Sequence, residues 1–164
     1  IPYYFWFLFI AATVFYFAFI NKNKKEYWQL VVSLGIGMTL FIIISLIFPN
    51  GQELRPSLSG DGVFIELVRY LYKIDTPTNV FPSIHVFNTI ACCIAVFCHK
   101  GFHFRRLVPA AAGILGTLIV LSTVFLKQHT LLDVAGAIVL NVFCYQLLYK
   151  PKAVQEKQPA RVRA

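Results

Sequence analysis

Five apolar stretches, each close to twenty residues long, limit the folds open to this chain. They cover 2–20, 28–48, 81–98, 107–126 and 131–149. A bilayer core of about 30 Å needs about 20 helical residues, and only helices or closed barrels satisfy the backbone inside it. Charged residues make up 13% of the chain, about half the share in soluble domains. The pattern predicts an all-α, polytopic bundle of five transmembrane helices.

The basic residues indicate how this bundle is oriented. Eleven of the fifteen Lys and Arg residues fall on one side of the predicted membrane: Lys22, Lys24, Lys25, Lys100, Arg105, Arg106, Lys150, Lys152, Lys157, Arg161 and Arg163. By the positive-inside rule that side is cytoplasmic. The net charge of +8 thus reports topology rather than binding of nucleic acid. We expect a multi-pass protein of the cell membrane with a cytoplasmic C-terminus.

The chain divides into two parts. Residues 1–150 are predicted to form one transmembrane catalytic domain, and residues 151–164 a basic, disordered cytoplasmic tail. The chain opens at Ile1 without a methionine and is already apolar. A sixth span preceding Ile1 is therefore expected. The oligomeric state stays open.

Several residues outside the apolar stretches, or at their ends, are given structural roles. Apolar residues recur at helical spacing on the outer side, at Val63, Phe64, Leu67, Val68, Leu71 and Ile74. This predicts a short amphipathic helix in the membrane surface. The aromatic residues over 3–9 are interpreted as an interfacial belt. His99 and His103 are interpreted as interfacial residues of the inner loop, and the four cysteines as apolar packing residues.

His129 and Asp133 stand four residues apart where the last stretch begins. In a helix such residues share one face, so the carboxylate can hold one imidazole nitrogen while the other nitrogen faces a substrate. Proteins orient a base or a nucleophile in this way. A carboxylate at membrane depth costs roughly 2 to 3 kcal/mol on insertion scales. We therefore interpret the pair as a candidate catalytic site.

Three more residues are predicted to lie at the same outer level. Ser83 follows Pro82 and is expected to cap the next helix, with His85 in its first turn and Arg55 near the bilayer. Free N–H groups at a helix start bind phosphate. These parts suit phosphoryl transfer, in which one histidine attacks phosphorus and the other protonates the leaving oxygen. No carboxylate set suited to magnesium or calcium is apparent, so no metal or cofactor is expected.

These residues resemble the motifs of a known family. The type 2 phosphatidic acid phosphatase superfamily of integral membrane enzymes carries Lys-x6-Arg-Pro, then Pro-Ser-Gly-His, then Ser-Arg-x5-His-x3-Asp. The matching residues here are Arg55-Pro56, then Pro82-Ser83-Ile84-His85, then Ser122-Thr123 with His129 and Asp133. The resemblance covers roughly residues 48–136.

The resemblance implies a role for each matching residue. His129 would be the nucleophile that forms a phosphohistidine, Asp133 its orienting partner, and His85 the acid for the leaving group. Arg55 and Ser83 would hold the phosphate, with Ser122 as a further contact from the third motif. The substrate would be a lipid phosphate or an isoprenoid diphosphate whose apolar part stays in the bilayer.

The chain departs from the family pattern at three motif positions. Phe48 replaces the first-motif lysine, Ile84 the second-motif glycine, and Thr123 the third-motif arginine. Two of three phosphate-binding cations are therefore absent. From its spacing, Lys127 could restore one of them, or could simply face the lipid headgroups.

Three functions stay open after these observations. The first is a metal-independent lipid phosphatase. The second is a phosphotransferase that moves a lipid-borne phospho-headgroup to an alcohol or lipid, because altered motifs also look like those of such relatives. The third is a scaffold or lipid-binding protein that keeps the motif without turnover, since a fold does not determine a function.

Overall fold

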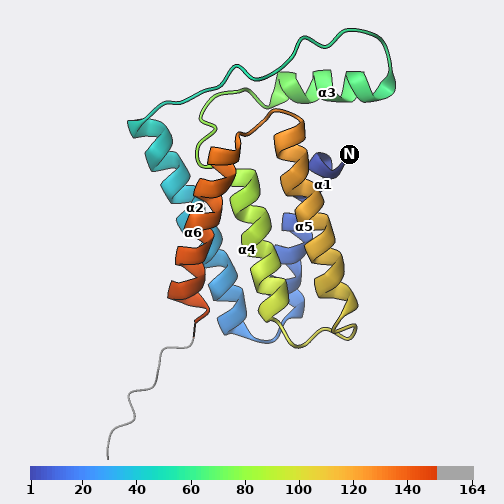
Figure 1. The fold of residues 1–164 in the computed structure, drawn as a ribbon. Coiled ribbons are helices and arrows are strands. Elements are labelled where there is room, and N and C mark those ends of the chain that lie inside the picture. The colour runs from blue at the N-terminus through green and yellow to red at the C-terminus, as the bar shows by residue number, and fades with distance from the viewer. Residues whose placement is uncertain (151–164) are drawn as a thin grey trace, which may run out of the picture.

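The computed structural model describes residues 1–150, and the regular structure of these residues is helical (Figure 1). The elements are α1 (Pro2–Phe15), a π-helical turn η1 (Tyr16–Ile20), α2 (Lys24–Ile47), α3 (Val63–Ile74), α4 (Ile84–Cys98), α5 (Leu107–Phe125) and α6 (Leu131–Leu148). The predicted all-α fold is confirmed for this part of the chain. The tail predicted over 151–164 lies outside the described residues.

Among residues 1–150, four helices are long and apolar enough to cross a membrane: α1 with η1, α2, α5 and α6. Their outward faces carry large apolar side chains, such as Phe19, Leu46 and Phe125, each more than three-quarters exposed. Contiguous apolar surface of this kind is rare on soluble monomers. These features are consistent with a membrane protein.

Helix α4 lies at the centre of the bundle and packs against α1, α2, α5 and α6. It has 15 residues, which corresponds to about 22 Å at 1.5 Å per residue. Most of its side chains are buried, Asn88 and Thr89 among them. Because protein rather than lipid surrounds this helix, its polar residues are tolerated.

Close approach of α4 to its neighbours depends on small residues. A Cβ atom added at Gly37 in α2 would lie 2.0 Å from the Phe87 ring. A Cβ atom at Gly136 in α6 would lie 2.7 Å from the Phe81 ring, just before α4. Distances this short are steric clashes, so glycine at both positions allows the start of α4 to sit between α2 and α6.

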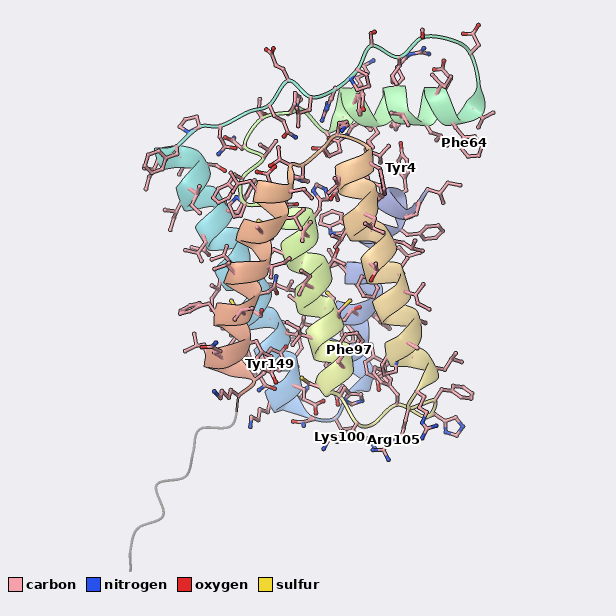
Figure 2. The ribbon with its side chains drawn as sticks, in the orientation of Figure 1. Tyr4, Phe64, Phe97, Lys100, Arg105 and Tyr149 are labelled. Carbon is pink, nitrogen blue, oxygen red and sulfur yellow. The ribbon has the colours of Figure 1, made fainter. Side chains whose placement is uncertain are left out.

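Helix α3 lies across one end of the bundle, together with the long loop over 49–62 (Figure 1). We call this the α3 end; the opposite end carries the loops over 21–23 and 99–106, from which Lys100 and Arg105 project (Figure 2). The predicted amphipathic helix is confirmed at 63–74. Its residue Phe64 is 70% exposed and points from α3 towards the level of the bundle (Figure 2).

Polar capping residues determine where two helices begin. Helix α2 begins at Lys24 because the Asn23 side chain accepts a hydrogen bond from the Lys25 amide, at 3.1 Å. Helix α4 begins at Ile84, directly after Ser83. Caps of this kind satisfy amide groups that the first turn leaves unpaired.

Candidate active site

Two imidazoles meet at the α3 end of the bundle. His85 lies in the first turn of α4, and His129 lies in the loop between α5 and α6. His85 Nδ1 is 3.3 Å from His129 Nε2. The two side chains are 44 residues apart in sequence, so the fold brings them together.

The end of α5 directs His129 into the bundle. Lys127 adopts the left-handed backbone conformation, with φ of 54°. The amides of Lys127 and Gln128 bond back to the carbonyls of Val124 and Thr123, each at 3.0 Å. This pair of bonds is a Schellman motif, which usually has glycine at the left-handed position. The sharp turn leaves Gln128 and His129 only 2% and 6% exposed.

Asp133 has two partners in the first turn of α6. Its Oδ2 accepts a hydrogen bond from the Thr130 amide at 2.6 Å, and its own amide donates to Thr130 Oγ1 at 3.2 Å. This reciprocal pair is a capping box. The same Oδ2 lies 3.8 Å from His129 Nδ1. His129 and Asp133 are thus close, as predicted, although this distance is longer than a hydrogen bond. Hydrogen bonds between catalytic groups are often long when no substrate is bound.

Ser83 is the N-cap of α4, as predicted. Its hydroxyl accepts a hydrogen bond from the Val86 amide at 3.3 Å, and the side chain is fully buried. Its own amide donates to the backbone carbonyl of Asp133 at 3.3 Å. Ser83 therefore joins the start of α4 to the start of α6, the two places that carry the site.

The other nitrogen of His85 faces α1. Tyr3 is 6% exposed, and its hydroxyl lies 2.9 Å from His85 Nε2 while donating to the carboxylate of Asp75. The Trp6 indole donates to the His85 carbonyl at 3.0 Å, and its ring packs on the imidazole with centroids 4.3 Å apart. The interpretation of the first aromatic cluster as an interfacial belt is therefore wrong for Tyr3 and Trp6, because both contact the site.

Arg55 connects α3 to the loop that carries His129. Its guanidinium donates to the carbonyls of Tyr72 and Asp75 and to Gln128 Oε1. It also stacks on the Tyr72 ring, 4.6 Å from the centroid. Burial raises the pKa of the Tyr72 phenol, whose hydroxyl donates to the Leu126 carbonyl at 3.0 Å. In this structure Arg55 donates to other groups of the protein, and Gln128 and Asp75 are the site residues that it contacts.

A small cavity of about 80 Å³ opens beside the two imidazoles, with His85, Gln128, His129 and Asp75 in its lining. That volume is several times the roughly 15 Å³ that one water molecule needs. Two lining residues carry a buried nitrogen atom with no hydrogen-bond partner among residues 1–150, Gln128 Nε2 and His129 Nδ1, and so does Arg55 at its Nε, which is bonded to Gln128 through its guanidinium. Unpaired buried groups are costly, and they indicate a place that a polar ligand completes.

None of the four residues predicted to bind substrate, Arg55, Ser83, Ser122 and Lys127, is part of this lining within residues 1–150. Lys127 is exposed and is not part of the lining within residues 1–150. Ser122 is half-buried, and its hydroxyl bonds back to the Ile119 carbonyl at 2.7 Å within α5. Their predicted contacts with a phosphate stay predictions.

The opposite end of α4 holds a second histidine cluster. His99 Nδ1 lies 2.6 Å from Glu26 Oε2, and its Nε2 lies 3.1 Å from the Tyr16 hydroxyl. Asn21 donates to the same carboxylate oxygen at 2.9 Å. His99 thus ties α4 to η1 and α2. Within residues 1–150, no three histidine, cysteine or acidic side chains are placed to hold a metal ion together.

Sequence reasoning missed three residues of the site: Tyr3, Asp75 and Gln128. Only Gln128 gave a signal, because it is a polar neighbour of His129 between two apolar stretches. The arrangement as a whole places two imidazoles in contact, with buried polar nitrogen atoms of the same loop beside them. Comparison with family models, with curated proteins and with solved structures found no match for this chain.

Proposed function

We propose that this protein is a metal-independent membrane phosphatase that acts on a lipid phosphate or isoprenoid diphosphate through a phosphohistidine. The observation that carries the proposal is the contact between His85 Nδ1 and His129 Nε2, at 3.3 Å beside a small cavity that both residues line. The motif resemblance described above supports the same reaction.

The chemistry assigns one role to each imidazole. His129 Nε2 attacks phosphorus while its Nδ1 faces Asp133, which stabilises the proton there. As the phosphorus–oxygen bond breaks, the proton on His85 Nδ1 passes to the leaving oxygen. In the second half-reaction His85 takes a proton from water, which attacks the phosphohistidine and releases phosphate. Gln128 Nε2 and Arg55 Nε, both unpartnered within the described chain, would donate to the phosphoryl oxygens.

The proposed setting is a bundle of five spans, with α4 as the short central one. The α3 end would face the extracytoplasmic side, because the loops of the opposite end carry Lys22, Lys100 and Arg105 with other basic residues. Helix α3 would then lie in the headgroup region. Lipid substrate would reach the cavity from the bilayer, with its apolar part left among the lipid chains.

A second candidate is a phosphotransferase that moves a phospho-headgroup to an alcohol or lipid. The buried group next to His129 is the neutral amide of Gln128, and the exposed Lys127 does not line the cavity. Few cations around the phosphorus favour a phosphodiester, which carries one negative charge, over a monoester, which carries up to two.

The test is to trap the phosphoenzyme. The purified protein in detergent, with excess chelator, is mixed with phosphatidic acid labelled at phosphorus and quenched in base, where phosphohistidine survives. We expect label on the wild type and none on His129→Ala, with phosphate released to water. A strict metal requirement, or full activity in His129→Ala, would refute the proposal. Adding candidate alcohols separates the two functions, since a transferase yields a new phosphodiester in place of free phosphate.

A further inference from the structure

We propose that Tyr3 and Asp75 form a relay that orients His85 and stabilises positive charge on its imidazole. The inference rests on the phosphatase function proposed above and adds two positioning residues to it. Neither residue belongs to the motifs discussed above.

The geometry gives each imidazole its own carboxylate. Asp133 lies directly behind His129, with 3.8 Å between Oδ2 and Nδ1. Asp75 stands behind His85 at one remove, because the Tyr3 hydroxyl donates to Asp75 and lies 2.9 Å from His85 Nε2. A phenol that donates to a carboxylate has its oxygen lone pairs free to accept from the Nε2–H. The hydrogen bonds therefore run from His85 through Tyr3 to Asp75.

The protons in this arrangement balance without any transfer through the phenol. In the charged imidazole, Nε2–H is held by Tyr3 and Nδ1–H points at the cavity. When Nδ1 gives its proton to the leaving oxygen, His85 becomes neutral and keeps Nε2–H. No proton moves to or from Tyr3 or Asp75 in either step. Their effect is electrostatic, since a carboxylate stabilises the positive charge on His85 before that charge is used.

Burial makes this effect substantial. Tyr3 is 6% exposed, Asp75 is half-buried, and the Trp6 ring contacts the imidazole at an interplanar angle of 51°. In a site that excludes water, charges interact more strongly than at an exposed surface. The backbone carbonyl of Asp75 also accepts from Arg55, which keeps the residue in place at the end of α3.

The relay predicts a dependence on the leaving group. An alkoxide from a lipid leaves only when it is protonated, whereas 4-nitrophenoxide leaves without a proton. Tyr3→Phe should therefore lower kcat for dioctanoyl phosphatidic acid about tenfold to a hundredfold, and change kcat for 4-nitrophenyl phosphate less than about threefold. Tyr4→Phe is the matched control, because Tyr4 is the next residue of α1 and its hydroxyl donates to the Leu67 carbonyl instead. It should leave both rates unchanged.

A second variant keeps the test decisive if Tyr3→Phe does not fold. Asp75→Asn preserves the shape and the backbone carbonyl but removes the charge, so it should lower the same ratio of rates. It should also move the basic limb of the pH profile for the lipid substrate to lower pH, because less charge keeps His85 protonated as pH rises. The ionisable groups that face His85 are Tyr3 from α1, Asp75 after α3, and His129 with Asp133 behind it.

The outcomes separate this inference from the proposed function. If the wild type forms a phosphohistidine but Tyr3→Phe and Asp75→Asn slow both substrates equally, or slow neither, the relay is wrong and the phosphatase stands. If the wild type forms no phosphohistidine with either substrate, both proposals fail. A selective loss with the lipid substrate, absent in Tyr4→Phe, supports the relay.

Discussion

The two ends of α4 each place a histidine beside a tyrosine of the first helical segment and an acidic residue. At the α3 end His85 meets Tyr3, which is bonded to Asp75. At the opposite end His99 meets Tyr16 and Glu26. The residue types are nearly the same, but the two clusters differ in whether their buried nitrogen atoms all have hydrogen-bond partners.

At the opposite end both ring nitrogens of His99 have partners within the protein. At the α3 end His85 Nδ1 faces a second imidazole, and buried nitrogen atoms of Gln128, His129 and Arg55 have no partner within residues 1–150. A polar cluster that satisfies itself stabilises the fold. Buried donors without a partner lower the stability of the fold. Such a cost is expected at a site where a bound ligand accepts hydrogen bonds from those donors.

The largest expected effect comes from replacing the histidine at either end of α4, His85 or His99, with glutamine. His85→Gln should lower turnover of a lipid phosphate by about 10² to 10⁴ with a small effect on stability, because glutamine still bonds to Tyr3. His99→Gln should lower the free energy of unfolding by about 1 to 3 kcal/mol, because it removes the contact with Glu26 Oε2 and leaves that carboxylate only its hydrogen bond from Asn21. Activity per folded molecule should stay within about threefold of wild type.

Phosphate release and thermal unfolding in the same detergent measure both variants. Equal losses of activity per folded molecule would remove the distinction between the two clusters.

A smaller effect is expected from paired glutamines. Gln128→Glu keeps an acceptor for Arg55 but replaces the unpartnered amide with negative charge, so kcat/KM should fall about tenfold to a hundredfold with stability retained. Gln29→Glu removes the 2.6 Å bond from Gln29 Nε2 to the Leu148 carbonyl at the opposite end. It should cost about 1 to 2 kcal/mol of stability and leave kcat/KM unchanged. Steady-state kinetics with unfolding curves would reveal the reverse pattern if the cavity were merely structural.

The smallest effect concerns Lys127. Its left-handed backbone favours glycine, so Lys127→Gly should raise the free energy of unfolding by about 0.5 to 1 kcal/mol. Because the side chain is exposed and away from the cavity lining of the described chain, kcat/KM should change less than about threefold. Lys127→Arg is the control that keeps the charge. A large rise in KM for the glycine variant alone would return Lys127 to the role of a phosphate-binding cation.

Local patterns in the sequence predicted the helices and part of the site well. The long apolar stretches, the spacing of apolar residues over 63–74 and the cap at Ser83 each depend on neighbouring residues. The contact between His85 and His129 agrees with the prediction that both residues lie at the start of a helix on the same side of the membrane. The capping box of Thr130 and Asp133 is visible in the sequence as Thr-x-x-Asp, but the same aspartate also has the spacing of a partner for His129, so the sequence does not show which contact it makes.

Long-range contacts explain what the sequence could not predict. Tyr3 contacts Asp75 and His85 from 72 and 82 residues away, and an aromatic residue near a membrane end is usually an anchor. Whether Tyr3 faces lipid or α4 depends on how α1 is rotated, which packing decides. The Schellman motif at Lys127 could not be predicted either, because the left-handed position of this motif is usually glycine.

The two contacts of Asp133 connect His129 to the first turn of α6. The carboxylate oxygen that caps α6 is also the one nearest His129. In the proposed reaction, a phosphoryl group on His129 would draw that oxygen closer, and the amide of Thr130 would lose part of its acceptor. The first turn of α6 would then loosen, and hydrogen exchange at the Thr130 amide would become faster in the phosphorylated protein.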